Sequence, residues 1–266
     1  MNPFSVFDQE HYEALNAARE AVLRPLLQGI QRNFQIESAL DVGCGSGHFT
    51  GLLHGEGLRV VGLDGRAENV ALAGSRHPDI PFFTANLEDD EVRKQGPADV
   101  VLCFGLLYHL ENPFRAVRNL FALTGKVLFV ESMCLPLDFP AMELRDECST
   151  ADQGLHFVAF YPSEACLTKL LYRAGFTRVY RLGRHPEHQA YRNSARQKKS
   201  RTMLVASGFD LNLQQLEYVP EPAAVPDPWG TAWERLGAPL RRLQSLLAKP
   251  WPEKVAAVRR RLSGSL

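Results

Sequence analysis

One segment of this chain constrains its fold more than any other. Residues 37–47 read Glu-Ser-Ala-Leu-Asp-Val-Gly-Cys-Gly-Ser-Gly, an apolar strand that runs into three alternating glycines, Gly43, Gly45 and Gly47. Glycine lets the backbone turn sharply and approach a ligand where any Cβ would collide. A second apolar strand ends on Asp64, where a carboxylate is placed to hold two ribose hydroxyls. The two strands together predict a nucleoside-binding site.

The spacing of the glycines separates two kinds of nucleoside ligand. A dinucleotide site reads G-x-G-x-x-G, with a helix N-terminus facing a pyrophosphate. Here the third glycine comes one residue early, and His48 stands where a dinucleotide site needs Gly or Ala. The carboxylate of Asp41, facing the ligand, would repel a pyrophosphate but suits a ligand that carries an ammonium and a sulfonium. The pattern therefore disfavours a NAD-type oxidoreductase, which stays as an alternative.

Residues 41–47 closely resemble the first motif of the class I S-adenosylmethionine-dependent methyltransferases. The resemblance implies that the chain is an enzyme, that its cofactor is S-adenosyl-L-methionine, and that it transfers a methyl group. It also implies that a set of residues in this region contacts the cofactor: Asp41, Gly43, Cys44, Gly45, Gly47, Asp64 and Gly65. A non-catalytic protein that uses the same fold only for assembly is the alternative from a different class.

Apolar strands alternate with helical or turn-rich segments through most of the chain. The expected strands lie at residues 39–42, 60–64, 82–85, 99–104 and 126–131. This alternation demands a parallel sheet with right-handed crossovers. Residues 177–182 and 201–206 are expected to close the sheet as an antiparallel pair. The order resembles the doubly wound, Rossmann-like, seven-stranded α/β fold of the methyltransferases over residues 35–207.

Three segments lie outside or interrupt this expected core. In the resembled family a leading helix often covers the cofactor, so residues 1–34 are expected to form a helical cap whose Tyr12 contacts it. Residues 132–161 exceed the two to six residues usual for such a connection, which indicates a substrate lid. Residues 208–266 indicate a Pro-containing linker and a basic amphipathic C-terminal helix with leucines in 4-3-4 spacing: Leu236, Leu240, Leu243 and Leu247. This helix is expected to pack on its own domain or on a second subunit of a homodimer, with peripheral contact to a membrane surface as the alternative.

Residues that follow the third and fourth strands are expected to complete the cofactor site, because ligands of an open parallel sheet bind beyond the carboxyl ends of its strands. Asn86 and Leu87 resemble the family position that holds the adenine edge, where an amide side chain offers both a donor and an acceptor. Phe104 and Gly105 are expected to border the methionine part of the cofactor.

The candidate catalytic residues come next along the chain. Methyl transfer is an in-line displacement, so positioning of the acceptor is the main contribution, and a hydroxyl acceptor must also lose its proton. Tyr108 and His109 are expected to project toward the acceptor, and an imidazole accepts a proton around neutral pH. Glu131, at the end of the fifth strand, and His156, in the predicted lid, are expected to orient the acceptor.

Several chemistries are disfavoured by what the sequence lacks. It has no Asn/Asp-Pro-Pro-aromatic turn after the fourth strand, which is typical of base amino-methylation, and no Pro-Cys pair for pyrimidine C5 methylation. The 5 cysteines are widely spaced without a C-x-x-C pair, and no acidic triad is recognisable, so no metal is expected. No secretory pattern and no apolar run of about 18 residues occurs, which predicts a cytoplasmic protein.

Two branches of the family differ in their acceptors. Residues 105–113, Gly-Leu-Leu-Tyr-His-Leu-Glu-Asn-Pro, resemble small-molecule and sugar methyltransferases and also enzymes that carboxymethylate a wobble uridine of transfer RNA. The second branch has arginines after the Tyr-His pair, whereas this chain has Leu110 and Glu111. This difference favours the first branch.

The charge distribution is compatible with the second branch but does not require it. Net charge is zero, but residues 178–266 hold 16 of the 30 Lys and Arg residues and only 7 of the 30 Asp and Glu residues. The basic stretch 178–201 suits RNA, a nucleotide sugar or a lipid-linked glycan, and a solvated hairpin is equally compatible with it. We expect a hydroxyl of a small molecule or carbohydrate as the acceptor, with RNA as the alternative.

Overall fold

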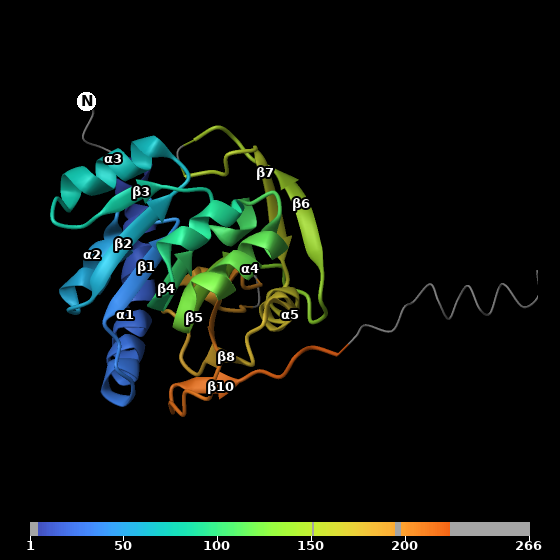
Figure 1. Cartoon of the computed structure of the whole chain (residues 1–266). Coiled ribbons are helices and arrows are strands. Elements are labelled where there is room, and N and C mark those ends of the chain that lie inside the picture. The colour runs from blue at the N-terminus through green and yellow to red at the C-terminus, as the bar shows by residue number, and fades with distance from the viewer. Residues whose placement is uncertain (1–4, 151, 195–197, 224–266) are drawn as a thin grey trace, which may run out of the picture. The chain divides into compact units, whose positions relative to one another are not determined.

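The computed structural model describes residues 5–150, 152–194 and 198–223. Its centre is an eight-stranded sheet with the strand order β10-β8-β9-β5-β4-β1-β2-β3 (Figure 1). The bounds of the strands are β1 (Ser38–Val42), β2 (Arg59–Asp64), β3 (Phe82–Thr84), β4 (Ala98–Phe104), β5 (Thr124–Met133), β8 (Arg178–Leu182), β9 (Arg201–Ser207) and β10 (Leu216–Tyr218).

The topology confirms the predicted doubly wound, mostly parallel α/β sheet. Strands β1 to β5 pair in parallel, and β9 runs antiparallel to both β5 and β8. The number of strands differs from the prediction, because β10 adds an eighth strand antiparallel to β8, with Leu216 opposite Leu182. A strand of three residues is too short to show a periodicity, so the sequence analysis assigned these residues to a linker.

The described residues form five α-helices: α1 (Glu10–Asn33) precedes β1, and the helices between strands are α2 (His48–Gly55), α3 (Ala67–Arg76), α4 (Pro113–Leu123) and α5 (Glu164–Ala174). Their ends follow local sequence signals. The side chain of Asn112 accepts a hydrogen bond from the Arg115 amide before α4, and Ser163 caps α5 in the same way. The same described residues contain four short 3-10 helices: η1 (Val6–Asp8) ahead of α1, η2 (Asp90–Gln95) and η3 (Leu107–His109) on either side of β4, and η4 (Gln189–Tyr191) between β8 and β9.

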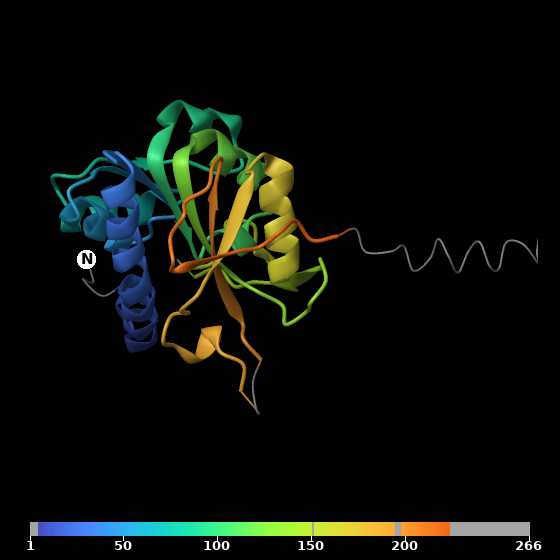
Figure 2. The ribbon, with the colours of Figure 1, turned by 90° about the horizontal axis from the view of Figure 1, so that it is seen from below.

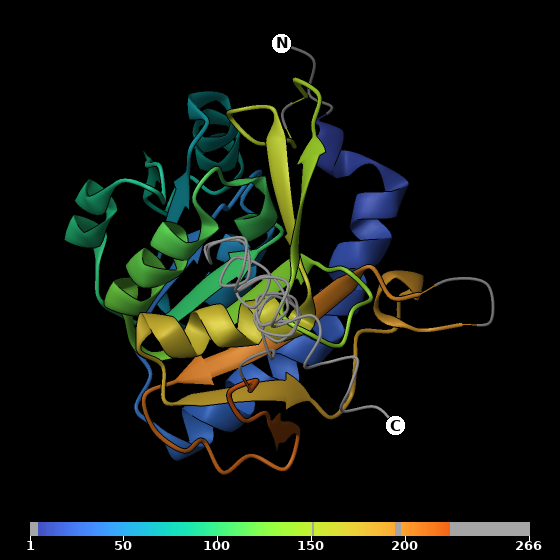
Figure 3. The same cartoon turned by 90° about the vertical axis from the view of Figure 1, so that its right-hand side faces the viewer.

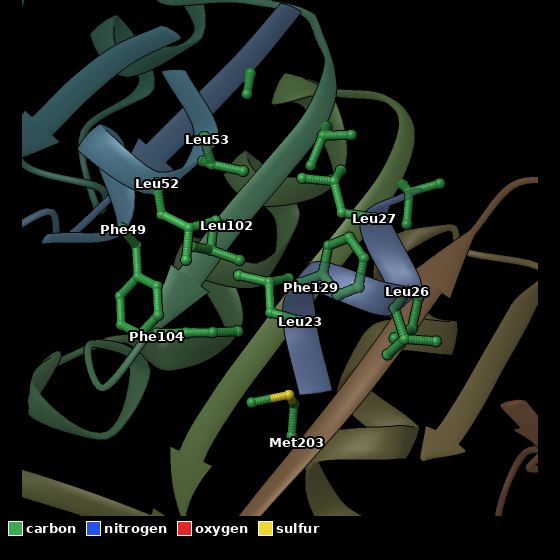
Figure 4. Packing of buried hydrophobic residues seen from close by; sticks show 14 of the residues in the cluster. Leu23, Leu26, Leu27, Phe49, Leu52, Leu53, Leu102, Phe104, Phe129 and Met203 are labelled. Carbon is green, nitrogen blue, oxygen red and sulfur yellow. The ribbon is translucent and has the colours of Figure 1, made fainter. Parts of the chain in front are cut away.

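Helices cover both faces of the sheet (Figure 2). A hydrophobic core forms on each side. Leu23 and Leu27 of α1 pack with Phe129 of β5 on one face, and all three side chains are fully buried (Figure 4). On the other face, Leu120 of α4 and Leu167 of α5 belong to the second cluster. Burying one Leu side chain fully stabilises the folded state by roughly 1.5–3 kcal/mol relative to leaving it exposed. Helix α1 is therefore part of the core and not only a cover over one end of the sheet.

The long connection at residues 132–161 contains a hairpin outside the main sheet. Strand β6 (Met142–Asp146) pairs antiparallel with β7 (Val158–Pro162). In Figure 3 this hairpin projects beyond the end of the main sheet, beside the N-terminal part of α1. The loop between the two strands returns toward the carboxyl ends of β1, β2 and β4. We refer to residues 132–161 as the insertion.

Most of the predicted C-terminal segment, residues 224–266, lies outside the described part of the chain. The predicted basic helix, with Leu236, Leu240, Leu243 and Leu247, lies outside the described residues, and so do the homodimer and membrane contacts predicted for it. Within the described part of the chain, no helix is both long enough and apolar enough to cross a bilayer.

Candidate active site

A pocket lies where the carboxyl ends of β1, β2 and β4 meet α1 and the insertion. Most residues that the sequence analysis selected line it: Tyr12, Gly43, Cys44, Gly45, Asp64, Gly65, Asn86, Leu87, Phe104, Gly105, Tyr108 and His109. Four selected residues do not line it: Asp41, Gly47, Glu131 and His156. The sheet topology brings the first group together because parallel strands end at one edge.

The glycine turn shapes one wall of the pocket. Gly43 and Gly45 have φ angles of 77° and 52°, in the left-handed region that side chains avoid. A Cβ on Gly43 would lie 2.8 Å from the Cβ of Leu106, and a Cβ on Gly45 would lie 3.2 Å from the ring of Phe7. Gly47, with φ 85°, begins α2 and faces His77 instead of the pocket.

Asp64 ties the glycine turn to the end of β2. Its carboxylate accepts hydrogen bonds from the amides of Gly45 and Arg66, both at 2.9 Å, and from the side chain of Asn69 at 3.1 Å. Burial raises the pKa of Asp64 more than these hydrogen bonds lower it. The carboxylate is therefore held in one position on the pocket wall.

Asp41 has a different environment from the one expected. Its carboxylate is 3% exposed and accepts a hydrogen bond of 2.6 Å from the Thr50 hydroxyl of α2. Burial raises the pKa of Asp41 to about 7. Neighbouring side chains of a strand point to opposite faces, so Val42 lines the pocket while Asp41 faces the helix behind it. The expectation that this carboxylate faces the ligand directly does not match this geometry.

Asn86 lines the expected adenine side of the pocket. Its side-chain oxygen accepts a hydrogen bond from the Glu88 amide at 3.0 Å, and its backbone carbonyl accepts one from the Asp89 amide at 3.1 Å. The residue therefore shapes the turn after β3. Within the described residues, its side-chain NH₂ group donates no hydrogen bond.

Tyr108 and His109 come from η3, directly after β4. Their rings lie 4.0 Å apart between centroids, and both side chains line the pocket although they are largely buried. Arg201 of β9 donates a hydrogen bond of 3.3 Å to the Tyr108 hydroxyl. Gly105, with φ 71°, allows the chain to turn from β4 into η3.

Glu131 lies beneath the pocket and is fully buried. It accepts hydrogen bonds from Arg19 at 2.7 Å, from Arg201 at 3.0 Å and from the Tyr191 hydroxyl at 2.8 Å. Burial by itself raises the pKa of Glu131, but the two guanidinium groups outweigh it and lower that pKa below its usual range. Glu131 therefore holds two arginines that line the pocket, and it does not reach the pocket itself.

Arg19 and Arg201 were not selected from the sequence, although one of them left a signal there. Arg19 interrupts the apolar stripe of α1 between Leu15 and Leu23 and is 5% exposed. A buried glutamate such as Glu131 also needs a cation nearby. Neither signal identifies the partner, because Arg19 and Glu131 are 112 residues apart.

The insertion contributes residues to the wall of the pocket. Residues 152–155 line the pocket, whereas the predicted His156 is half-exposed and lies 3.8 Å from Glu111. The Tyr12 hydroxyl donates a hydrogen bond of 2.6 Å to Asp152, so α1 and the insertion meet over the pocket. Arg66 donates to the carbonyl oxygens of residues 153 and 154, both at 3.1 Å.

A second contact joins the insertion to the catalytic candidate. Glu147 Oε1 lies 2.6 Å from His109 Nδ1, and the two side chains are 4% and 8% exposed. The other carboxylate oxygen accepts a hydrogen bond of 2.9 Å from the Gly154 amide. No motif spacing links residues 38 positions apart, so sequence reasoning missed Glu147. Among the described residues, no group of three His, Cys, Asp or Glu side chains is arranged to hold a metal ion.

Comparisons with known proteins place this geometry in a family. A model of the methyltransferase domain matches residues 11–181. The ubiquinone biosynthesis O-methyltransferase of Vibrio parahaemolyticus is 30% identical over 130 residues, which cover 41% of this chain and 54% of that protein. The tRNA U34 carboxymethyltransferase of Actinobacillus succinogenes is 28% identical over 152 residues, covering 54% of this chain and 46% of that protein. The chain thus spans about half the length of these curated relatives.

Solved structures show the same fold at low sequence identity. The N-terminal domain of EvdMO1 with SAH bound has a TM-score of 0.58 and 20% identity, covering 75% of this chain and 84% of that one. Magnesium protoporphyrin IX methyltransferase from Synechocystis PCC 6803 with SAH bound has a TM-score of 0.52 and 18% identity, covering 75% and 87%. Because the family model spans more than half of the chain, this protein belongs to the methyltransferase domain family, within the class I S-adenosylmethionine-dependent methyltransferases.

Proposed function

We propose that this methyltransferase transfers the methyl group of S-adenosylmethionine to a hydroxyl of a small molecule or sugar, with His109 as the general base. The bound cofactor supplies an electrophilic methyl group on a sulfonium. Everything else in the reaction falls to the residues of this chain, which must hold the cofactor, orient the acceptor and remove one proton.

The residues that line the pocket fit a cofactor with a nucleoside and an amino-acid part. Asp64 offers a fixed carboxylate to the ribose hydroxyls, and Asn86 offers an amide to the adenine edge. A Cβ built on Gly105 would lie 3.7 Å from the Arg19 guanidinium, so Arg19 stands beside the wall expected to border the methionine part. A guanidinium there suits a carboxylate. Gly43 and Gly45 leave space where side chains would collide.

The position of His109 is the main observation in favour of a hydroxyl acceptor. Its imidazole lines the pocket beyond Gly105, next to the Tyr108 ring. A hydroxyl becomes a competent nucleophile only as it loses its proton, and a positioned base contributes about 10²–10⁴ in rate. The relative from Vibrio parahaemolyticus is named as an O-methyltransferase, which supports oxygen as the accepting atom.

The ion pairs of the basic stretch support a small acceptor over RNA. Arg181 and Lys199 both pair with Glu164, and Arg184 pairs with Glu187 at 2.7 Å. Cations that are engaged within the domain contribute less to binding a phosphate backbone. Transfer RNA remains the second candidate acceptor, favoured by the similarity to the tRNA U34 carboxymethyltransferase.

The test is a turnover assay of the full chain with S-adenosylmethionine and a panel of phenols, sugars, nucleotide sugars and unmodified transfer RNA. We expect S-adenosylhomocysteine and an O-methylated product from a small hydroxyl compound. His109→Ala should lower kcat by about 10²–10⁴-fold, while calorimetry with S-adenosylhomocysteine gives an unchanged Kd. Turnover of transfer RNA alone, or full activity of His109→Ala, would overturn the acceptor class or the base respectively.

A further inference from the structure

We propose that Glu147 is the positioning residue of His109, and that the insertion thereby supplies part of the catalytic base. This inference rests on the proposed role of His109. Glu147 comes from the insertion, whose other described contacts with the pocket only form its wall. Proton removal by His109 would therefore depend on the position of the insertion.

The hydrogen bond between the two side chains selects one form of the ring. A neutral imidazole carries one proton, on either Nδ1 or Nε2, and an ionised carboxylate only accepts hydrogen bonds. With Glu147 Oε1 at 2.6 Å from Nδ1, the proton belongs on Nδ1. The lone pair is then on Nε2, the nitrogen that is left to take a proton from an acceptor. The same carboxylate stabilises the positive charge that the ring gains when it does so.

The other carboxylate oxygen is also occupied, which fixes the orientation of the group. The Gly154 amide donates to Glu147 Oε2 at 2.9 Å, and the Glu147 amide donates to the Phe157 carbonyl at 2.9 Å. Both contacts lie within the loop that joins β6 and β7. The carboxylate is therefore held by its own loop on one side and by His109 on the other.

Gly154 allows this loop to lie directly on His109. A Cβ at position 154 would come 2.5 Å from the His109 carbonyl oxygen and 3.2 Å from the His109 Cβ. The first contact is with backbone, which cannot move aside as a flexible side chain would. Arg66 binds the carbonyl oxygens of residues 153 and 154 and so holds the same loop against the end of β2. Glu147 reaches His109 only while the loop is seated in this way.

Glu147→Gln tests this proposal because the contact with the Gly154 amide fixes which end of the glutamine side chain faces His109. The Gly154 N–H requires an oxygen, so the glutamine oxygen should take that position and leave its NH₂ group facing His109 Nδ1. A donor at Nδ1 forces the proton onto Nε2, and the ring can no longer act as a base from that atom. The variant keeps the size and both contacts of the native side chain.

The primary measurement is the ¹⁵N NMR spectrum of the histidine rings in the full-length protein, with His109→Ala used to assign the signal. It needs no acceptor. We expect the Nδ1–H form in the native protein and the Nε2–H form in Glu147→Gln. Glu143→Gln is the matched control, because Glu143 lies on the same hairpin but is exposed and pairs with Arg145. It should give the native spectrum.

Kinetics supply the second measurement, with whichever acceptor the panel identifies. Glu147→Gln should lower kcat by about 10²–10⁴-fold, with KM and the Kd for S-adenosylhomocysteine changed little, and Glu147→Asp should retain part of the activity. An Nε2–H form in the native protein, or the same form in the native protein and Glu147→Gln, would overturn the proposal. Loss of activity in His109→Ala alone, without loss in Glu147→Gln, would overturn it too while leaving His109 as the base.

Discussion

The two halves of the pocket are built in different ways. One half, the glycine-turn half, consists mainly of backbone at the ends of β1 and β2, where Gly43, Gly45 and Asp64 lie within 22 residues of one another. The other half, the charged half, depends on side chains from distant segments: Arg19 of α1, His109 of η3 and Arg201 of β9 line it, and Glu147 of the insertion contacts His109. The first half depends on local conformation, and the second depends on long-range contacts between charged groups.

This difference predicts how each half responds to mutation. A glycine turn fails when a side chain is added, because the space and the φ angle are both lost. A network of buried charges destabilises the fold when one partner is removed, because the remaining buried charges are left uncompensated. The experiments below probe both halves, and each would weaken the distinction if its result were reversed.

The largest effect is expected in the glycine turn. Gly43→Val places a side chain at φ 77° and within 2.8 Å of the Leu106 Cβ, so it should weaken binding of S-adenosylhomocysteine by at least about 100-fold. Calorimetry on the folded variant measures this. Gly55→Ala, where a Cβ would meet no atom within 4 Å, is the control and should bind as the native protein does. Affinity within threefold of native for Gly43→Val would show that the turn does not form the cofactor site.

At the buried charge network the expected effect is on folding stability and not on binding. Glu131→Gln leaves Arg19 and Arg201 without their carboxylate and should lower the free energy of unfolding by about 3–5 kcal/mol. Urea denaturation at neutral pH measures it, with the exposed Glu143→Gln as a control expected to change by less than about 0.5 kcal/mol.

The same pair of proteins tests the pH dependence. Because the pKa of Glu131 is lowered in the folded state, its contribution is present above its ordinary value of 4.5 and is lost as the pH falls through the lowered value. The native protein should therefore lose its advantage over Glu131→Gln in acid. An advantage that stays constant from pH 7 to below pH 4 would argue against an ionised Glu131.

A smaller effect of opposite sign is expected at Asp41. Its pKa is raised to about 7, so the folded state disfavours the ionised form, and stability is lost as the pH rises from the ordinary value of 3.8 to about 7. Asp41→Asn keeps an acceptor for the Thr50 hydroxyl. In the absence of cofactor, its stability relative to the native protein should rise by about 3 kcal/mol between pH 5 and pH 8, because the native protein loses about 1.4 kcal/mol per pH unit until the pH reaches about 7. Denaturation curves at pH 5 and pH 8 that shift equally in both proteins would contradict this.

The smallest effect is expected where α1 meets the insertion. Tyr12→Phe removes the hydrogen bond to Asp152 but leaves the contacts of Arg66 and Glu147 in place. Hydrogen exchange of residues 147–157 should accelerate by about three- to tenfold, since one net hydrogen bond contributes about 1 kcal/mol. Tyr218→Phe, at an exposed tyrosine, should leave the exchange unchanged. Unchanged exchange in Tyr12→Phe would mean that α1 does not hold the insertion closed.

The sequence predicted the sheet topology and the glycine turn because the signals for both are local. The strand-glycine-helix pattern located the turn, and the alternation of strands gave the parallel sheet together with the antiparallel pair β8 and β9. The two largest differences came from elements without a periodic signal. Strand β10 has three residues, and the environment of Asp41 depends on which face of β1 meets α2.

By itself, the sequence determined which backbone would turn, where the strands would end, and hence the family and the location of its pocket. Only the tertiary structure decided which charged side chains meet there. It paired Glu131 with two arginines, brought Glu147 to His109, and left the predicted His156 outside the lining of the pocket. The physical reason is that backbone conformation is set by neighbouring residues, whereas a buried ion pair is set by whichever distant segments fold against each other.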